Sequence, residues 1–92
     1  MYVILTYDIK IEDDGPKVLR NVFKLCKKYL THIQDSVFEG ELSDSQIMKL
    51  NIELKKYIRN DKDSIIIFKS RHERWLDKEF WGKKDDKLSN IF

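Results

Sequence analysis

The N-terminal segment YVILTYDI, residues 2–9, constrains the fold of this chain more than any other stretch. Successive side chains of a β-strand point to opposite faces of its sheet, which sorts this segment into two sets. One face carries Val3, Leu5, Tyr7 and Ile9, and the other carries Tyr2, Ile4, Thr6 and Asp8. The first face is wholly apolar and is expected to meet helices. Because the second is also largely apolar, the strand is predicted to be central in its sheet.

An amphipathic helix is predicted after the turn DDGPK, with Pro16 at its first helical position. Its apolar stripe comprises Val18, Leu19, Val22, Phe23, Cys26, Tyr29 and Leu30. Its opposite side carries only basic residues, within about 100° at roughly 3.6 residues per turn. These residues are Lys17, Arg20, Lys24, Lys27 and Lys28. Such a stripe is either a solvated face or a track for a phosphate backbone, as in salt-sensitive duplex binding without base reading.

The middle of the chain predicts more strand and a second helix. Residues 33–42, IQDSVFEGEL, fit either one strand with a bulge or two short strands hinged at Asp35-Ser36. Ser43 and Gln46 have the spacing of a capping box, so a helix is predicted from there to about Ile58. Its expected buried face comprises Ile47, Leu50, Leu54, Tyr57 and Ile58.

The C-terminal third predicts a further strand and an irregular segment. Residues 64–68, SIIIF, are apolar on both faces and are expected to form another central strand. The segment 71–92 carries the large apolar residues Trp75, Leu76, Phe80, Trp81, Ile91 and Phe92. These side chains either pack back on their own sheet or form an interface with a second copy or another protein.

The order of the predicted elements indicates one α+β domain. Two helices that each follow a strand fit one face of a small antiparallel sheet, as in the split βαβ arrangement. We predict a ferredoxin-like domain over residues 1–70 and a C-terminal interface segment over residues 71–92. The sheet face that carries Asp8 then lacks a helix. A second copy of the chain is its expected cover, because small oligomers are most often two-fold dimers.

Composition excludes several classes of protein. The chain of 92 residues is 41% hydrophobic and 37% charged, as in a globular domain with a charged surface. It has no apolar run of the roughly 18 residues that a membrane span needs and no signal-peptide pattern. A single cysteine, Cys26, fits a reducing cytoplasm and the helix core. His32 and His72 lack the spacing of zinc ligands.

Four segments in this order resemble the CRISPR-associated protein two family, the small adaptation subunit of CRISPR systems. They are YVILTYDI, the basic helix, IQDSVFEGEL and DSIIIFKSR. The tail RHERWLDKEFWG resembles one subgroup, so the resemblance covers almost the whole chain. It implies a ferredoxin-like fold, a homodimer, and a larger integrase partner, in a heterohexameric complex, for inserting spacer DNA into a CRISPR array. Several relatives are also magnesium-dependent endonucleases on single-stranded RNA or double-stranded DNA.

The resemblance implies roles for particular residues. Asp8 matches the metal-binding aspartate that ends the first strand, and Tyr7 and Phe38 match residues of the same catalytic region. Ser36 matches the serine of the family's SVF segment, and Arg20 corresponds approximately to a basic residue of the first helix. The chain departs from many relatives at His32, where they carry arginine. Histidine is not bidentate and is only partly charged near neutral pH, which weakens the case for nuclease activity more than for DNA binding.

Asp8 has a chemical reason to hold a cation if a dimer brings two copies together. Two carboxylates about 4 Å apart repel by roughly 4 kcal/mol at an effective dielectric constant of about 20. They must share a proton or bind a cation, and Mg²⁺ accepts one or two carboxylates together with waters. The alternative is that Asp8 only ends its strand and bonds the turn.

Three functions are therefore open from the sequence. The first is a dimeric scaffold that binds DNA for spacer integration and holds Mg²⁺ at Asp8. The second is a stand-alone metal-dependent endoribonuclease that resembles toxin endonucleases of related fold. The third is a ferredoxin-like regulatory module that binds no nucleic acid.

Overall fold

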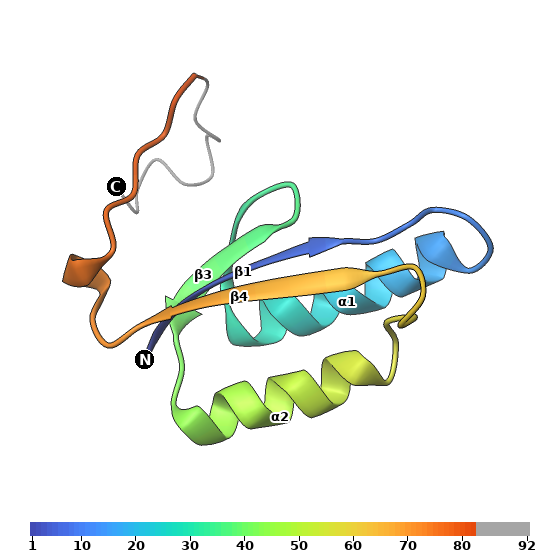
Figure 1. Ribbon diagram of the computed structural model, residues 1–92, viewed down its shortest axis with the longest axis horizontal. Coiled ribbons are helices and arrows are strands. Elements are labelled where there is room, and N and C mark those ends of the chain that lie inside the picture. The colour runs from blue at the N-terminus through green and yellow to red at the C-terminus, as the bar shows by residue number, and fades with distance from the viewer. Residues whose placement is uncertain (83–92) are drawn as a thin grey trace.

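The computed structural model describes residues 1–82 and folds as a four-stranded antiparallel sheet with two long helices. Its strands are β1 (Tyr2–Asp8), β2 (Thr31–Gln34), β3 (Val37–Glu41) and β4 (Ser64–Ser70). Its helices are α1 (Gly15–Tyr29), α2 (Asp44–Lys55) and the short 3₁₀ turn η1 (Glu73–Trp75). The order of strands across the sheet is β2-β3-β1-β4. This βαββαβ arrangement confirms the predicted ferredoxin-like fold (Figure 1).

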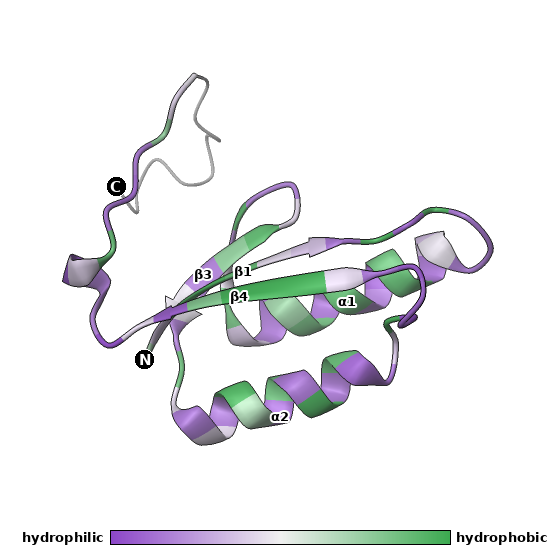
Figure 2. Cartoon of the chain, viewed as in Figure 1, coloured by the Kyte–Doolittle hydropathy of each residue, from purple (hydrophilic) through white to green (hydrophobic). Residues whose placement is uncertain are grey.

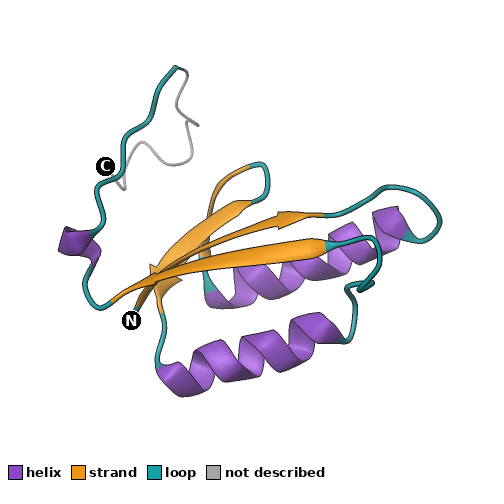
Figure 3. Ribbon diagram, in the orientation of Figure 1, coloured by secondary structure: helices purple, strands orange, loops and turns teal. Residues whose placement is uncertain are grey.

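Both long helices lie on the same face of the sheet, as the sequence predicted (Figure 3). Between the helices and the sheet lies a single core, which is made of Val3, Leu5, Tyr7, Val18, Val22, Cys26, Leu30, Phe38, Leu42, Leu50 and Leu54. The apolar face of β1 therefore points to the helices. In the described part of the chain, neither helix is long and apolar enough to cross a bilayer.

Strand β1 is central, as predicted, because it pairs with β3 on one side and with β4 on the other. Its register places Ile4 opposite Phe68 and Asp8 opposite Ser64. Directly opposed residues point to the same face of a sheet. The face without helices thus carries Asp8 together with alternate residues of β3 and β4.

The prediction that residues 64–68 form a central strand is wrong, because β4 is an edge strand that pairs only with β1 in the described residues. It is nevertheless continuously hydrophobic over most of its length (Figure 2). Ile65 and Ile67 pack against the core, whereas Ile66 and Phe68 on the other face are 53% and 55% exposed. The two-sided apolar pattern of β4 reflects side chains on the second face, Ile66 and Phe68, that the described chain leaves exposed.

Residues 33–42 form two strands rather than one bulged strand. Strands β2 and β3 form an antiparallel hairpin, and its turn lies at the predicted hinge, Asp35-Ser36, where Asp35 adopts a φ of 38°. The pairing shifts register between His32 and Gln34, so a local irregularity accompanies the hinge. The strand begins earlier than predicted, at Thr31.

The second helix begins as predicted but ends early. The side chain of Ser43 accepts from the Gln46 amide at 3.2 Å, and the Gln46 side chain accepts from the Ser43 amide at 2.8 Å. The helix ends at Lys55 rather than near Ile58, and the chain continues as a turn. Tyr57, predicted to be buried, is therefore exposed, whereas Ile58 still packs against the core.

The C-terminal segment returns to the sheet at Lys78, on the face without helices. Its ammonium lies 2.5 Å from Glu39 Oε1, and Glu39 also accepts a hydrogen bond from the Tyr2 hydroxyl. Tyr2 and Glu39 are both buried as a result. This contact fits the alternative in which the segment packs on its own sheet, at least at Lys78. The predicted apolar residues Ile91 and Phe92 lie outside the described residues.

Candidate functional site

Asp8 is the last residue of β1, and its side chain is exposed on the face of the sheet without helices. The chain turns away after it through residues 9–14 and enters α1. The strand thus presents a carboxylate at its end, as the sequence predicted, rather than burying it.

An arginine clamp holds the loop that follows Asp8. The Arg59 guanidinium donates to the carbonyl oxygens of Glu12 at 2.7 Å and Lys10 at 2.5 Å. It also forms an ion pair with Asp63 at 2.9 Å. Asp63 Oδ1 accepts from the Lys10 amide at 3.1 Å, so both backbone groups of Lys10 are bound. We call Arg59 and Asp63 the loop clamp.

The two side chains of the loop clamp differ in exposure, since that of Asp63 is fully buried whereas that of Arg59 is 18% exposed. Hydrogen bonds from the Arg59 side chain lower the pKa of Asp63 to about 2, against the opposing effect of burial. Lys62 adds longer ion pairs to Glu12 at 3.8 Å and Asp13 at 3.5 Å. These contacts give two of the loop acids a role that the sequence did not reveal, namely holding the β1–α1 loop to the α2–β4 loop.

A glycine at the start of α1 is required by the same loop. A Cβ atom added at Gly15 would lie 2.2 Å from the Lys10 carbonyl oxygen, which the loop clamp holds in place. Contacts between carbon and backbone oxygen at that distance are not tolerated, so the loop can approach the helix this closely only because Gly15 has no side chain.

A hollow of about 630 Å³ lies beside Asp8, between α1 and the β2–β3 turn. The residues that line it are Tyr7, Asp8, Ile9, Leu19, Arg20, Phe23, Lys24, Asp35 and Ser36. It joins five residues that the sequence analysis had singled out separately: Asp8, Tyr7, Arg20, Lys24 and Ser36. We call it the α1 hollow. Leu19 and Phe23 were predicted only as core, and sequence periodicity alone could not show that they would remain partly open.

The two other predicted catalytic residues, Tyr7 and Phe38, are buried, and Tyr7 lines the α1 hollow. Burial raises the pKa of the Tyr7 hydroxyl, so this group stays protonated at neutral pH and can donate a hydrogen bond. Phe38 is 0% exposed and packs with Tyr7 at a ring distance of 6.0 Å. Because a fully buried ring cannot touch a substrate, any contribution of Phe38 must pass through the rings that it packs against, those of Tyr7, Phe23 and His32.

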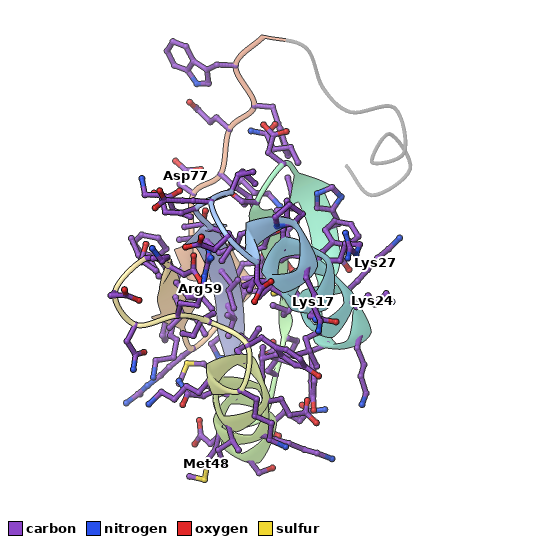
Figure 4. All side chains as sticks on the ribbon, turned by 90° about the vertical axis from the view of Figure 1, so that its right-hand side faces the viewer. Lys17, Lys24, Lys27, Met48, Arg59 and Asp77 are labelled. Atoms are coloured by element: carbon purple, nitrogen blue, oxygen red, sulfur yellow. The ribbon has the colours of Figure 1, made fainter. Side chains whose placement is uncertain are left out.

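Among the predicted nucleic-acid-binding residues, Arg20 and Lys24 are exposed and line the α1 hollow. Lys17, Lys27 and Lys28 continue the same basic side of α1, and all three are exposed. Lys24 and Lys27 project from one flank of α1, while Arg59 lies on the opposite flank of the molecule (Figure 4). The structure thus brings the stripe and the Asp8 end of β1 together at the hollow.

His32, at which the resemblance indicated a departure from the family pattern, lies on the helix side of the sheet, opposite the core residue Phe38. Its ring contacts Phe23 at a centroid distance of 5.0 Å and Phe38 at 4.9 Å. Its Nε2 lies 2.8 Å from the Asp35 carbonyl oxygen. These contacts tie β2 to the β2–β3 turn, so His32 supports the wall of the hollow.

The oxygen atoms near Asp8 are the kind that Mg²⁺ prefers. Asp8 and Asp35 offer carboxylates, and Ser36 offers a hydroxyl, which also lies 3.4 Å from the Thr6 hydroxyl. Within residues 1–82, however, no three acidic, histidine or cysteine side chains gather closely enough to enclose a metal. These residues therefore fit a cation that keeps several waters or takes a ligand from elsewhere, and not a closed cage.

The predicted interface residues differ in their exposure. Trp75 and Trp81 are exposed, Trp81 by 88%, whereas Leu76 and Phe80 are half-buried. Trp75 packs edge-on against His72 at 5.0 Å and beneath Arg74 at 5.9 Å. A surface pocket of about 190 Å³ separates Phe80 and Trp81 from Ile4, Ile33 and Val37 of the sheet.

The amino-acid sequence of this chain is similar to those of known proteins. Residues 1–78 match the family model described as CRISPR associated protein Cas2. A CRISPR-associated endoribonuclease Cas2 from Fusobacterium nucleatum is 54% identical over 91 residues, which cover 99% of this chain and 86% of that protein. A CRISPR-associated endonuclease Cas2 from Halalkalibacterium halodurans is 39% identical over 70 residues, covering 75% and 73% of the two chains.

Solved structures agree with the sequence matches. A crystal structure described as cas2 superposes with a TM-score of 0.80 at 36% identity and covers 94% of this chain and 91% of the other. Cas2 of Streptococcus pyogenes, crystallised at pH 6.5, gives a TM-score of 0.73 at 31% identity. Its superposition covers 87% of this chain and all of the other.

Proposed function

We propose that this chain, which belongs to the Cas2 family of CRISPR-associated proteins, is a nucleic-acid-binding nuclease of a CRISPR system. Its reacting centre is at Asp8. The observation that carries this proposal is the α1 hollow, where an exposed strand-end carboxylate lies beside Arg20 and Lys24. Carboxylate and basic groups at one site are the parts that phosphodiester chemistry requires. The names of the relatives, endoribonuclease and endonuclease, support the same reaction.

Each residue has a distinct part in this proposal. Arg20 and Lys24 bind phosphate oxygens and fix the backbone beside Asp8. Asp8 holds Mg²⁺ with help from water or from a second copy of the chain. When bound, Mg²⁺ supplies stabilisation for the negative charge that develops on the phosphate oxygens. The protonated Tyr7 hydroxyl can donate to one of those oxygens.

The test is Mg²⁺-dependent cleavage of labelled single-stranded RNA and of duplex DNA by the wild type and Asp8→Ala. We expect Asp8→Ala and added EDTA to abolish cleavage. Asp61→Ala, which removes an exposed carboxylate from the α2–β4 loop, is the matched control and should cleave like the wild type. Equal rates for wild type and Asp8→Ala would show that a contaminating nuclease is responsible.

The proposal includes a homodimer formed through the sheet face that carries Asp8. Ile66 and Phe68 are exposed on that face, and the register places Ile66 opposite Thr6 and two pairs from Asp8. A second copy that covers these side chains brings both Asp8 carboxylates to one interface. Light scattering should report a dimer for the wild type and for Ile52→Asp, an exposed change on α2, but a monomer for Ile66→Asp.

A scaffold role in spacer integration is the second candidate. The observation that favours it is the exposure of Trp75 and Trp81 after the last strand, because exposed aromatic side chains mark protein interfaces. Integration in vitro with a CRISPR integrase, which compares the wild type, Asp8→Ala and a chain that ends at residue 74, separates the two roles. Loss of integration only on truncation supports the scaffold, and unchanged integration by the truncated chain excludes this use of the segment.

A further inference from the structure

The α1 hollow has two kinds of surface, and phosphate binding uses only one of them. Its charged lining residues, which we call the rim, are Arg20 and Lys24 from α1, Asp8 from the end of β1 and Asp35 from the β2–β3 turn. Its walls are apolar and partly aromatic and come from Tyr7, Ile9, Leu19 and Phe23. A backbone phosphate needs the rim but has no use for the walls. The volume of about 630 Å³ lies within the range of pockets that hold small organic groups.

The walls of the α1 hollow are fixed before any ligand binds. The Tyr7 amide donates to the Ser36 carbonyl oxygen at 3.3 Å, which holds the β2–β3 turn against β1. The Phe23 ring packs edge-on against Phe38 at 5.5 Å and against His32 at 5.0 Å. Little free energy is therefore needed to order this site when a ligand binds, and rigid aromatic and apolar surfaces favour flat ligands.

A flat apolar ring joined to an anion is the chemistry that matches both surfaces. A nucleotide combines these two groups, because its base can lie against Leu19 and Phe23 while its phosphate meets Arg20 and Lys24. In a duplex the bases are stacked inside the helix and cannot enter a pocket, whereas an unpaired base can leave the stack. The carboxylates of Asp8 and Asp35 can accept hydrogen bonds from exocyclic amines or ribose hydroxyls.

We propose that the α1 hollow binds the base of one unpaired nucleotide in single-stranded nucleic acid, beside the Asp8 end of β1, with Leu19 and Phe23 as the contact surface. This inference rests on the proposed function, because it names the substrate class of the same site. It assigns α1 two tasks, since its basic side positions the backbone and its partly open apolar residues select strands with accessible bases.

The test measures affinity with EDTA present, so that no strand is cleaved. Fluorescence anisotropy compares a single-stranded RNA of about 12 nucleotides, its DNA counterpart, an abasic strand of the same length and charge, and a DNA duplex. We expect the wild type to bind the base-bearing strands about fivefold or more tightly than the abasic strand, the lower end of what stacking on a side chain contributes. Comparison of the affinities for the RNA strand and the DNA strand then shows which of the two the site prefers.

Two variants probe the site and one controls for them. Leu19→Trp fills the hollow, and Phe23→Leu removes the ring but keeps an apolar side chain. Ile52→Trp places the same new ring on the exposed face of α2. Leu19→Trp and Phe23→Leu should lose the preference for base-bearing strands and keep the wild-type affinity for the abasic strand and the duplex, whereas Ile52→Trp should keep the preference. Retained affinity for the duplex also shows that a variant is folded.

The outcomes separate this inference from the proposed function. Equal affinity of the wild type for abasic and base-bearing strands overturns the base site but leaves the nuclease proposal standing. A preference that survives both Leu19→Trp and Phe23→Leu also overturns it, because the base then binds elsewhere. Absence of binding to every strand at low salt overturns the proposed function and this inference together.

Discussion

Replacing Asp63 by asparagine removes the buried charge of the loop clamp without changing the size of the side chain. The Asp63 carboxylate accepts from the Arg59 side chain and from the amides of Arg59 and Lys10. These bonds hold the loop that follows Asp8 against the loop that precedes β4. The variant therefore tests whether a pair of residues far along the chain from Asp8 fixes the loop beside the candidate site.

The magnitude follows from the pKa of the Asp63 carboxyl. Its fall from an ordinary 3.8 to about 2 corresponds to about 2 kcal/mol, at about 1.4 kcal/mol for each tenfold change in proton affinity. Because the folded pKa lies below the unfolded pKa, this stabilisation is fully present above pH 3.8 and is lost as the pH falls toward about 2. Asp63→Asn should therefore lower the free energy of unfolding by about 2 kcal/mol near neutral pH.

Urea unfolding over a series of pH values measures this effect. The difference between wild type and Asp63→Asn should be constant from neutral pH to about pH 4 and should shrink at lower pH. Asp61→Asn removes a neighbouring charge and should show no such pattern. Amide hydrogen exchange at Lys10 gives a local measurement, since its amide donates to Asp63 at 3.1 Å. Equal stability and equal Lys10 exchange in the Asp63 and Asp61 variants would refute the clamp.

Two further substitutions and one chemical modification test the fold. Gly15→Ala should destabilise the chain by about 1–3 kcal/mol in urea, because the new Cβ would lie 2.2 Å from the Lys10 oxygen. Burial raises the pKa of the Cys26 thiol to about 12, so Ellman's reagent at mildly alkaline pH should react with Cys26 only as fast as the chain unfolds, and rapid reaction in native buffer would contradict the buried position. Ser43→Ala should cost about 1 kcal/mol, measured as a lower Tm, because it removes the bond to the Gln46 amide.

Much of the fold could be predicted because local signals and the core agreed. The alternation of β1 identified a central strand, and the spacing of Ser43 and Gln46 identified the start of α2. Strand β4 was misplaced because an apolar residue such as Ile66 gives the same signal whether or not its own chain covers it. Sequence alternation reports that a face is apolar, and it does not report which molecule lies against it.

The candidate site was predictable in its residues but not in its geometry. Asp8, Tyr7 and Arg20 were each singled out, yet only the packing of α1 beside the β2–β3 turn brings them to one hollow. Arg59 and Asp63 were missed because charged residues in a loop are usually exposed to solvent. The signal was present, since an arginine and an acid four residues apart can pair, but burial of that pair depends on a loop distant in sequence.

Contacts within one chain position each part of the candidate site. Asp8 depends on its own strand for position, the loop after it depends on Arg59 and Asp63, and the wall beside it depends on Phe23 and its contacts with His32 and Phe38. None of these contacts needs a second chain. One protomer therefore forms the α1 hollow alone, whereas the proposed metal site would need ligands that residues 1–82 of one chain do not supply. It follows that a monomeric variant such as Ile66→Asp should still bind nucleic acid at the α1 hollow even if it no longer cuts it.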